Sequence, residues 1–146
     1  MFKYILFILL VFSVTSFGKT HAESNITVHV RIEGFKNEKG LCYLLLFESK
    51  KGFPESREHA AMILKDRIMN KSAEFELDIR SGIYAISILH DENLNERLDK
   101  TWYGRPVEGF GISNNPSVGF GPPTFQESSI SLQDNNDFLK IEMIYL

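Results

Sequence analysis

The stretch ITVHVRIEGFKNEKGLCYLLLF, residues 26–47, predicts two neighbouring strands joined by a turn. Apolar and polar residues alternate from Ile26 to Ile32, which is the pattern of a strand with one buried face. Phe35–Gly40 is rich in polar residues and predicts a turn. The run Leu41–Phe47 is apolar at every position, as expected of a central strand that is covered on both faces.

Further strand signals follow along the chain. Ala73–Ile79 alternates in the same way, and Ile83–His90 is mostly apolar. Glu55–Leu64 could form one or two helical turns or an irregular crossover, and its residues leave both open. Several short strands separated by turn residues, without a long amphipathic helix, predict a single all-β sandwich. The remaining expected strands are a short one within Ile63–Met69, one at Ser129–Leu132, and Phe138–Tyr145, in which Leu139, Ile141, Met143 and Tyr145 share a face.

Residues 1–22 have the pattern of a secretory signal peptide. The basic Lys3 precedes an apolar run, Tyr4–Val14, and small and polar residues lead to Ala22. A membrane anchor is the alternative, but the run is well short of the roughly 20 apolar residues that a spanning helix needs. We therefore expect cleavage after Ala22, export to the periplasm, the cell surface or the medium, and one β-sandwich domain at 23–146 without a transmembrane helix.

The charge of the predicted mature chain bears on its partners. Residues 1–22 contain Lys3 and Lys19 and no acidic residue, so removing them leaves 14 basic and 19 acidic residues, a net charge of −5. That balance gives no support for binding to nucleic acid or to an anionic membrane. The single cysteine, Cys42, has no partner for an intramolecular disulfide and is expected to be an inert buried residue.

The stretch HDENLNERLD, residues 90–99, places oxygen-bearing side chains at alternate positions, as calcium loops do. Two features count against an ion: Glu96 stands where glycine makes the sharp turn, and Trp102 stands where a bidentate Glu is usual. Any ion would therefore bind weakly, at about 10⁻⁴ to 10⁻³ M. The alternative is a polar turn stabilised by hydrogen bonds from Asn and Asp side chains. The candidate metal ligands are Asp91, Asn93, Asn95, the carbonyl of Arg97, and Asp99.

His90 invites a catalytic hypothesis, because it precedes an acidic residue. Adjacent residues on a strand point to opposite faces, so His90 and Asp91 cannot form a dyad there. The simpler expectation is a strand-end histidine that is hydrogen-bonded to the loop that follows. The sequence contains no zinc-binding set, nucleophile elbow or phosphate-cradling glycine loop.

Asp91–Pro123 is long, rich in Gly, Pro and Asn, and poor in strand signals. Its aromatic residues favour an ordered, packed segment over a flexible tail. These residues, namely Trp102, Tyr103 and the aromatic-glycine run from Gly109 to Phe125, could line a ligand groove for sugar rings or peptides, or their rings could form the plug that closes one end of the sandwich. The need for large side chains in a loop-covered core favours the plug.

Three longer motifs make the chain recognisable: GLCYLLLFESKKGFP (residues 40–54), SGIYAISILHDENLNERLDKTWYGRPVEGFGISNN (residues 81–115) and GFGPPTFQESSISL (residues 119–132). Together they resemble a family of exported bacterial proteins known only as a domain of unknown function, numbered twenty-one forty-one. The resemblance implies an immunoglobulin-like or transthyretin-like β-sandwich, export, and no established enzymatic activity. Many members carry glycine where this chain has Leu94 and Glu96, which counts against transferring a calcium role.

The resemblance also draws attention to the run EGFGISNN, residues 108–115. This run could fold over Asp91–Asp99 and lend oxygens to it, with Glu108 supplying a carboxylate. The candidate ligand-contacting or supporting residues are therefore His90, Trp102, Tyr103, Glu108, Asn114 and Asn115.

The function expected from the sequence is a non-catalytic binding or interaction module of the cell envelope. Its ligand would be an envelope or extracellular protein, peptide or glycan, and Ca²⁺ is the candidate cofactor. One alternative is an enzyme or enzyme accessory domain with a site around His90, Asp91 and Glu108. The other is a purely structural envelope protein. Convergence of those three side chains in a pocket would favour the enzyme.

Overall fold

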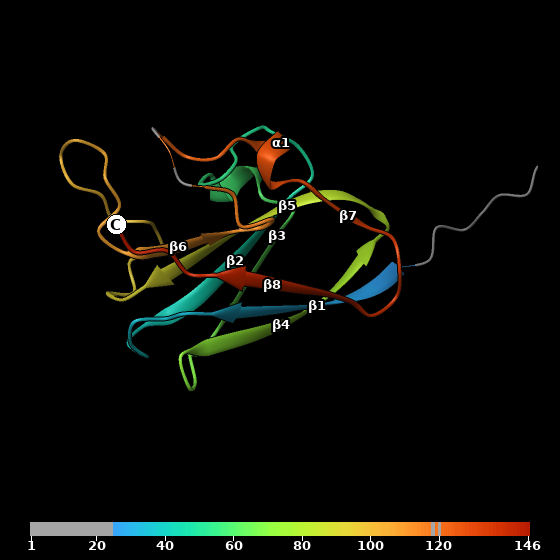
Figure 1. The fold of residues 1–146 in the computed structure, drawn as a ribbon, viewed down its shortest axis with the longest axis horizontal. Coiled ribbons are helices and arrows are strands. Elements are labelled where there is room, and N and C mark those ends of the chain that lie inside the picture. The colour runs from blue at the N-terminus through green and yellow to red at the C-terminus, as the bar shows by residue number, and fades with distance from the viewer. Residues whose placement is uncertain (1–24, 118, 120) are drawn as a thin grey trace, which may run out of the picture.

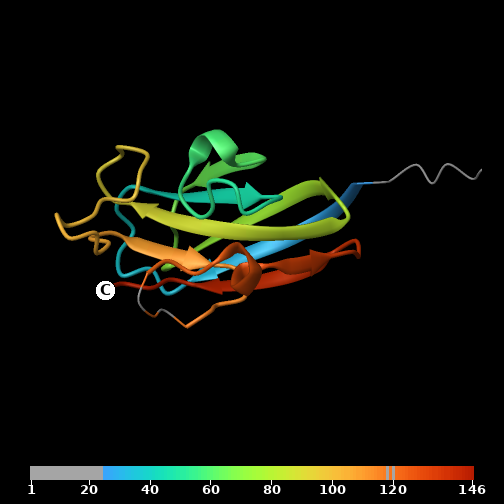
Figure 2. The ribbon, with the colours of Figure 1, turned by 90° about the horizontal axis from the view of Figure 1, so that it is seen from above.

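The computed structural model describes residues 25–117, 119 and 121–146, which form a nearly all-β domain of two sheets (Figures 1 and 2). The predicted leader, residues 1–22, lies outside the described residues. One sheet has the strand order β4-β1-β8, and the other has the order β3-β2-β5-β6, with β7 also paired to β5. The elements are β1 (Asn25–Glu33), β2 (Leu41–Phe47), the 3₁₀ helix η1 (Arg57–His59), β3 (Met62–Asp66), β4 (Ser72–Arg80), β5 (Gly82–Asp91), β6 (Gly109–Ile112), α1 (Phe125–Ser128), β7 (Ile130–Leu132) and β8 (Asp137–Glu142).

β1 is the middle strand of the three-stranded sheet. It pairs antiparallel with β4 and parallel with β8. Its apolar residues face inward and are buried, whereas Thr27, His29 and Arg31 on the other face are partly exposed. β4 shows the same alternation of buried and exposed residues. Both strands that the alternating pattern predicted are therefore confirmed.

The main core lies between the two sheets and includes Phe35 from the turn after β1. Burial raises the pKa of the Cys42 thiol, which agrees with the expected inert residue. The strands within residues 25–146 thus close one core among themselves. The two sheets contribute Val28, Val30, Ile32, Leu77 and Ile141 from one side, and Cys42, Leu44, Leu46, Ile86 and Ile88 from the other.

β2 is buried on both faces, as its continuous apolar run predicted. Its inward residues enter the main core, whereas Tyr43, Leu45 and Phe47 point to the outer face of the five-stranded sheet. There they form a second apolar cluster with Leu89, which is covered by side chains of the connecting segments. The covering side chains are Phe53, Ala60, Leu98 and Phe125. This second layer of packing brings loops that are far apart in the sequence onto one surface.

β6 is the main departure from the predicted fold, because it lies inside the segment that was expected to be irregular. Half of its residues are glycine, which hides the strand pattern. Both glycines face the end of the chain, which passes close behind them. A Cβ on Gly111 would lie 3.0 Å from the Cγ2 atom of Ile141, and a Cβ on Gly109 would overlap the ring of Tyr145. Glycine is therefore required by close packing, and the sequence cannot show that requirement.

The last strand is shorter than predicted, since β8 ends at Glu142. Beyond it, the N–H of Met143 still donates to the carbonyl of Glu33 in the first sheet. Ile144 then bonds in both directions with Phe110 of β6, at 2.7 and 3.1 Å. The end of the chain thus passes from one sheet to the other and ties them together.

The single-turn helix α1 was not predicted either. Its first turn is a capping box, in which Thr124 accepts the N–H of Glu127 and the Glu127 carboxylate accepts the N–H of Thr124. The Thr124-x-x-Glu127 spacing was the available signal. The Glu55–Leu64 region resolves into the 3₁₀ helix η1 and the start of β3.

Candidate functional site

Asp91 ends β5 and is fully buried. Its two carboxylate oxygens accept the N–H groups of Asn95 at 3.1 Å and Glu96 at 2.8 Å. Leu94 and Glu96 have φ of +64° and +65°, a left-handed conformation that costs a non-glycine residue about 1–2 kcal/mol. The Asp91 carboxylate offsets that cost by binding the backbone where the chain curls.

The other predicted ligands complete a hydrogen-bonded turn. The Asp99 carboxylate accepts the side-chain amides of Asn93 at 2.6 Å and Asn95 at 2.9 and 3.0 Å. The amide oxygens of these two residues accept the N–H groups of Asn95 and Arg97. This is the arrangement of the polar-turn alternative. Across the part of the chain that the structure describes, no group of three or more His, Cys, Asp or Glu side chains could hold a metal ion. Calcium binding stays a prediction.

Glu108 folds over this loop, as the sequence suggested. Its carboxylate accepts the N–H of Glu92 at 2.9 Å and the N–H of Asp99 at 3.1 Å. Asn114 and Asn115 do not join it, because β6 separates them from Glu108. They bind the carbonyls of Glu127 and Lys140. The expectation that the whole run EGFGISNN covers the loop was therefore wrong beyond its first residue.

His90 is fully buried, and both of its ring nitrogens have partners outside the loop that follows it. Its Nδ1 lies 2.8 Å from the Tyr145 hydroxyl, and its Nε2 lies 2.8 Å from the carbonyl oxygen of Lys39. The expected hydrogen bond to the following loop was thus wrong. His90, Asp91 and Glu108 are each occupied by partners within the fold, and none of them lines the cavity described below.

Trp102 and Tyr103 do not form a plug. They are the two central residues of a β-turn that is closed by a 2.9 Å hydrogen bond from the Gly104 N–H to the Thr101 carbonyl. Trp102 is 95% exposed and Tyr103 is 60% exposed. Their rings touch edge to face, with centroids 5.2 Å apart. The prediction that these rings fill the end of the core was wrong, because a short hairpin carries them away from it.

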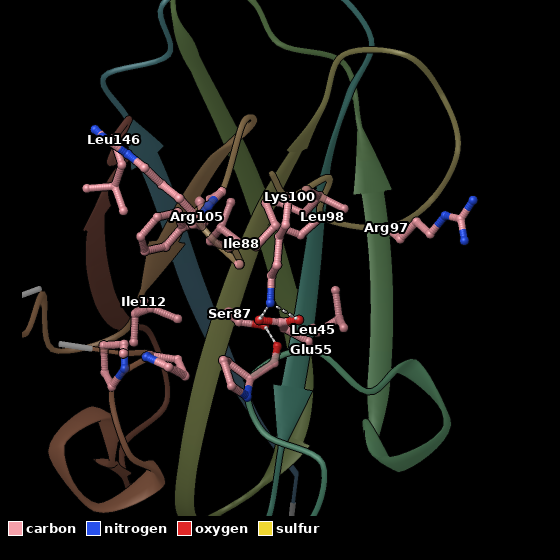
Figure 3. A pocket seen from close by; sticks show the side chains of 18 of the residues that line it. Leu45, Glu55, Ser87, Ile88, Arg97, Leu98, Lys100, Arg105, Ile112 and Leu146 are labelled. Atoms are coloured by element: carbon pink, nitrogen blue, oxygen red, sulfur yellow. Dashed lines mark hydrogen bonds and ion pairs between the residues drawn. The ribbon is translucent and has the colours of Figure 1, made fainter. Parts of the chain in front are cut away.

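A cavity of about 390 Å³ lies on the outer face of the five-stranded sheet (Figure 3). The register places Leu45, Ser87 and Ile112 in one row across β2, β5 and β6, and Leu89 and Phe110 in the next row. These five side chains form a mostly apolar floor. The walls come from segments distant in the sequence: Pro54 and Glu55, residues 96–98, residues 103–106, and Pro122–Pro123. The size falls in the range of small-molecule sites, about 300–1,000 Å³.

Charged side chains line several parts of the cavity, and two of them form an ion pair at its edge. Lys100 and Glu55 point toward one another in Figure 3, and their charged atoms are 2.5 Å apart. The Ser87 hydroxyl donates to the Pro54 carbonyl at 2.6 Å. Arg105 also lines the cavity and has no ion pair among the described residues. The site therefore combines an apolar floor with a polar edge and an uncompensated guanidinium.

The sequence held little information about the cavity floor. β2 and β5 are apolar on both faces, so their pattern does not show which face loops will cover. Ser87 was the available signal, because it is the one serine within the mostly apolar run IYAISILH.

Glu92, which opens the loop after β5, gives a prediction for pH. Burial on its own raises the pKa of Glu92, but hydrogen bonds from Lys36 and Asn37 outweigh it, so the net pKa lies below the ordinary 4.5. A lowered carboxyl pKa stabilises the folded state above the unfolded pKa, and this contribution is lost as the pH falls through the folded pKa. Lys36→Met should therefore flatten the fall of stability below about pH 4.5. Urea melts from pH 3 to pH 7 check this, and an unchanged pH profile would contradict it.

The described residues therefore define a two-sheet β domain with a loop-covered cavity on one outer face. The chain belongs to the bacterial family described as "Uncharacterized protein conserved in bacteria (DUF2141)", which matches residues 30–139. The comparison with curated proteins gives no match, and neither does the comparison with solved structures. No helix among the described residues is long and apolar enough to cross a membrane.

Proposed function

We propose that the protein is an exported, non-catalytic binding module of the bacterial cell envelope, and that its ligand occupies the cavity on the outer face of the five-stranded sheet. The observation that carries the proposal is the cavity itself, with its mostly apolar floor and charged side chains in its walls. The enzyme alternative is weaker, since His90, Asp91 and Glu108 are bound within the fold and lie outside this cavity.

The ligand that suits this cavity has an apolar body and an acidic end. Leu45, Ile112 and Phe110 offer apolar surface and no hydrogen-bonding side chain. Lys100 is neutralised by Glu55, and Arg97 points away from the other labelled side chains in Figure 3. Arg105, which has no ion pair among the described residues, is therefore the group able to bind a carboxylate. A guanidinium binds a carboxylate through two parallel hydrogen bonds, so it selects an acidic group over an alcohol.

Export and the finer fold class belong to the same proposal. Export is supported by the leader pattern of residues 1–22. An immunoglobulin-like or transthyretin-like sandwich is supported by two sheets of short strands that share one core. The cytoplasmic form would keep residues 1–22, so mass spectrometry of the protein from a periplasmic extract would test the predicted cleavage after Ala22.

The binding proposal is tested by calorimetric titration of residues 23–146 with three ten-carbon probes: decanoate, decanol and decyltrimethylammonium. We expect saturable binding with decanoate tightest, because only decanoate offers a carboxylate to Arg105. Ile112→Trp should abolish binding, since an indole would fill the floor. Phe138→Trp, which adds the same ring on exposed β8 of the other sheet, should leave decanoate affinity unchanged.

The outcomes separate a cavity-binding module from a purely structural protein. Equal decanoate binding by the wild type and Ile112→Trp would place the ligand elsewhere and reject the cavity. No binding of any probe would favour the purely structural alternative. Both variants need a cooperative melt before their affinities are compared.

A further inference from the structure

The hairpin between β5 and β6 presents large aromatic side chains to solvent. Trp102 is 95% exposed, although tryptophan is among the most buried residue types on average. Leu94, Tyr103 and Val107 on the same connecting segment are 58–60% exposed. Of these side chains, Trp102 and Tyr103 are in contact with each other, so they offer one continuous exposed aromatic surface.

The tip of the hairpin, residues 101–105, is held in shape by its own backbone. The Thr101 N–H donates to the Arg105 carbonyl at 2.8 Å, and the Arg105 N–H donates to the Thr101 hydroxyl at 3.0 Å. At the base, the Val107 N–H donates to the Asp99 carbonyl at 2.8 Å. Trp102 and Tyr103 are thus displayed by a closed turn, and little ordering is needed before they bind.

The tip lies at an end of the molecule. In Figures 1 and 2 the segment after β5 extends past the ends of the strands, opposite the end where β1 begins. It can therefore contact a flat surface without the two sheets intervening. Tryptophan and tyrosine are the residues that concentrate at membrane–water interfaces, where a ring can be half in lipid and half in water.

The local charge of the tip favours an anionic surface. Residues 100–107 contain Lys100 and Arg105 and no acidic side chain. Lys100 is paired with Glu55, whereas Arg97 and Arg105 are exposed and have no ion pair among the described residues. The net charge of −5 opposes such contact for the molecule as a whole. Screening limits that repulsion to about 8–10 Å, so a projecting tip is governed by its own charges.

We propose that the Trp102–Tyr103 tip docks on anionic lipid, with the two rings in the interface and Arg105 at the phosphate groups. Tyr103 also lines the cavity, so docking would bring the cavity edge close to the lipid surface. The docking proposal does not depend on what the cavity binds.

Trp102 is the sole tryptophan in the chain, so its fluorescence reports on the tip alone. We would titrate residues 23–146 with vesicles of equal parts phosphatidylglycerol and phosphatidylcholine, and with phosphatidylcholine vesicles. The leader is left out because its apolar run would itself enter lipid. We expect emission to move to shorter wavelength with the anionic vesicles, to move much less with the neutral ones, and to return toward its original wavelength as salt is added.

Co-sedimentation with the anionic vesicles measures the partition coefficients of three variants. Trp102→Ser should lower the partition coefficient at least about tenfold, as expected for removing a large buried ring. Arg105→Gln should lower it about fivefold, the share of one basic residue. Phe138→Ser, which removes an aromatic ring of 65% exposure on the other sheet, should change nothing.

Three results would overturn the docking proposal. If neither kind of vesicle changes the emission, the tip does not enter lipid, and a protein becomes the candidate partner of the tip. Sedimentation without an emission change would assign lipid binding to another face. Equal shifts in emission wavelength with neutral and anionic vesicles would show that Arg105 does not select anionic lipid.

Discussion

Asp91→Ala is expected to lower the free energy of unfolding by about 3 kcal/mol, because it removes two charge-assisted hydrogen bonds that a buried carboxylate accepts from the backbone of the following turn. The donors are the N–H groups of Asn95 and Glu96, which bind separate oxygens of the carboxylate. The left-handed conformation at Leu94 and Glu96 also loses its support. A loss of this size is a large part of the 5–15 kcal/mol that typically stabilises a domain.

Urea melts of the wild type, Asp91→Ala and Asp91→Asn measure this effect. Asparagine keeps one acceptor oxygen and places an amide where the second N–H donates, so it should lose about half as much or more. Asp78→Ala on β4, which removes an exposed carboxylate that has no ion pair among the described residues, is the matched control and should change stability by less than about 0.5 kcal/mol. If Asp91→Ala lowers the free energy of unfolding by less than about 1 kcal/mol, the left-handed turn at Leu94 and Glu96 forms without the carboxylate acceptor.

The same variants decide the calcium prediction. If Asp91 acts only as a hydrogen-bond acceptor, the loss should be equal in excess chelator and in millimolar calcium. If it binds an ion, calcium should raise the wild-type midpoint saturably, and Asp91→Ala should abolish that rise.

The strands of this fold were predictable where the burial or exposure of each strand face set the pattern of apolar and polar residues. β1 and β4 alternate because one face meets the core and the other meets water, and β2 is continuously apolar because loops cover its second face. β6 was not predictable, because its glycines pack closely against Tyr145 and Ile141, which are more than 25 residues away in the sequence. Contacts at that distance leave no local pattern.

The site was predictable only in its local part. Asp91, Asn93, Asn95 and Asp99 form one loop because short polar side chains bind nearby backbone, and sequence spacing shows this directly. The cavity depends on how three distant segments settle on one sheet face, so no spacing predicts it. Trp102 shows the opposite error: a large ring was expected inside the core, and hydrogen bonds that close the five-residue tip 101–105 hold it outside.

Glu108→Ala is expected to lower the free energy of unfolding by about 2–3 kcal/mol and to loosen the loop that walls the cavity. One Glu108 oxygen holds the Glu92 N–H where the loop begins, and the other holds the Asp99 N–H where the hairpin begins. Leu98 and Lys100 of the cavity wall lie next to the second of these points. Removing the Glu108 carboxylate therefore releases the backbone at Glu92 and at Asp99, on either side of this part of the cavity wall.

Hydrogen exchange and decanoate titration separate a local effect from a global one. The amides of Glu92 and Asp99 should exchange faster in Glu108→Ala than its lower global stability explains, and decanoate affinity should fall severalfold. Glu108→Gln, which keeps one acceptor, should have amide exchange rates and a decanoate affinity between those of the wild type and Glu108→Ala. Glu58→Ala on the exposed 3₁₀ helix removes a carboxylate without these bonds and is the matched control. Uniformly faster exchange across β1, β2 and the loop, with decanoate affinity retained, would show that Glu108 stabilises the fold without shaping the cavity.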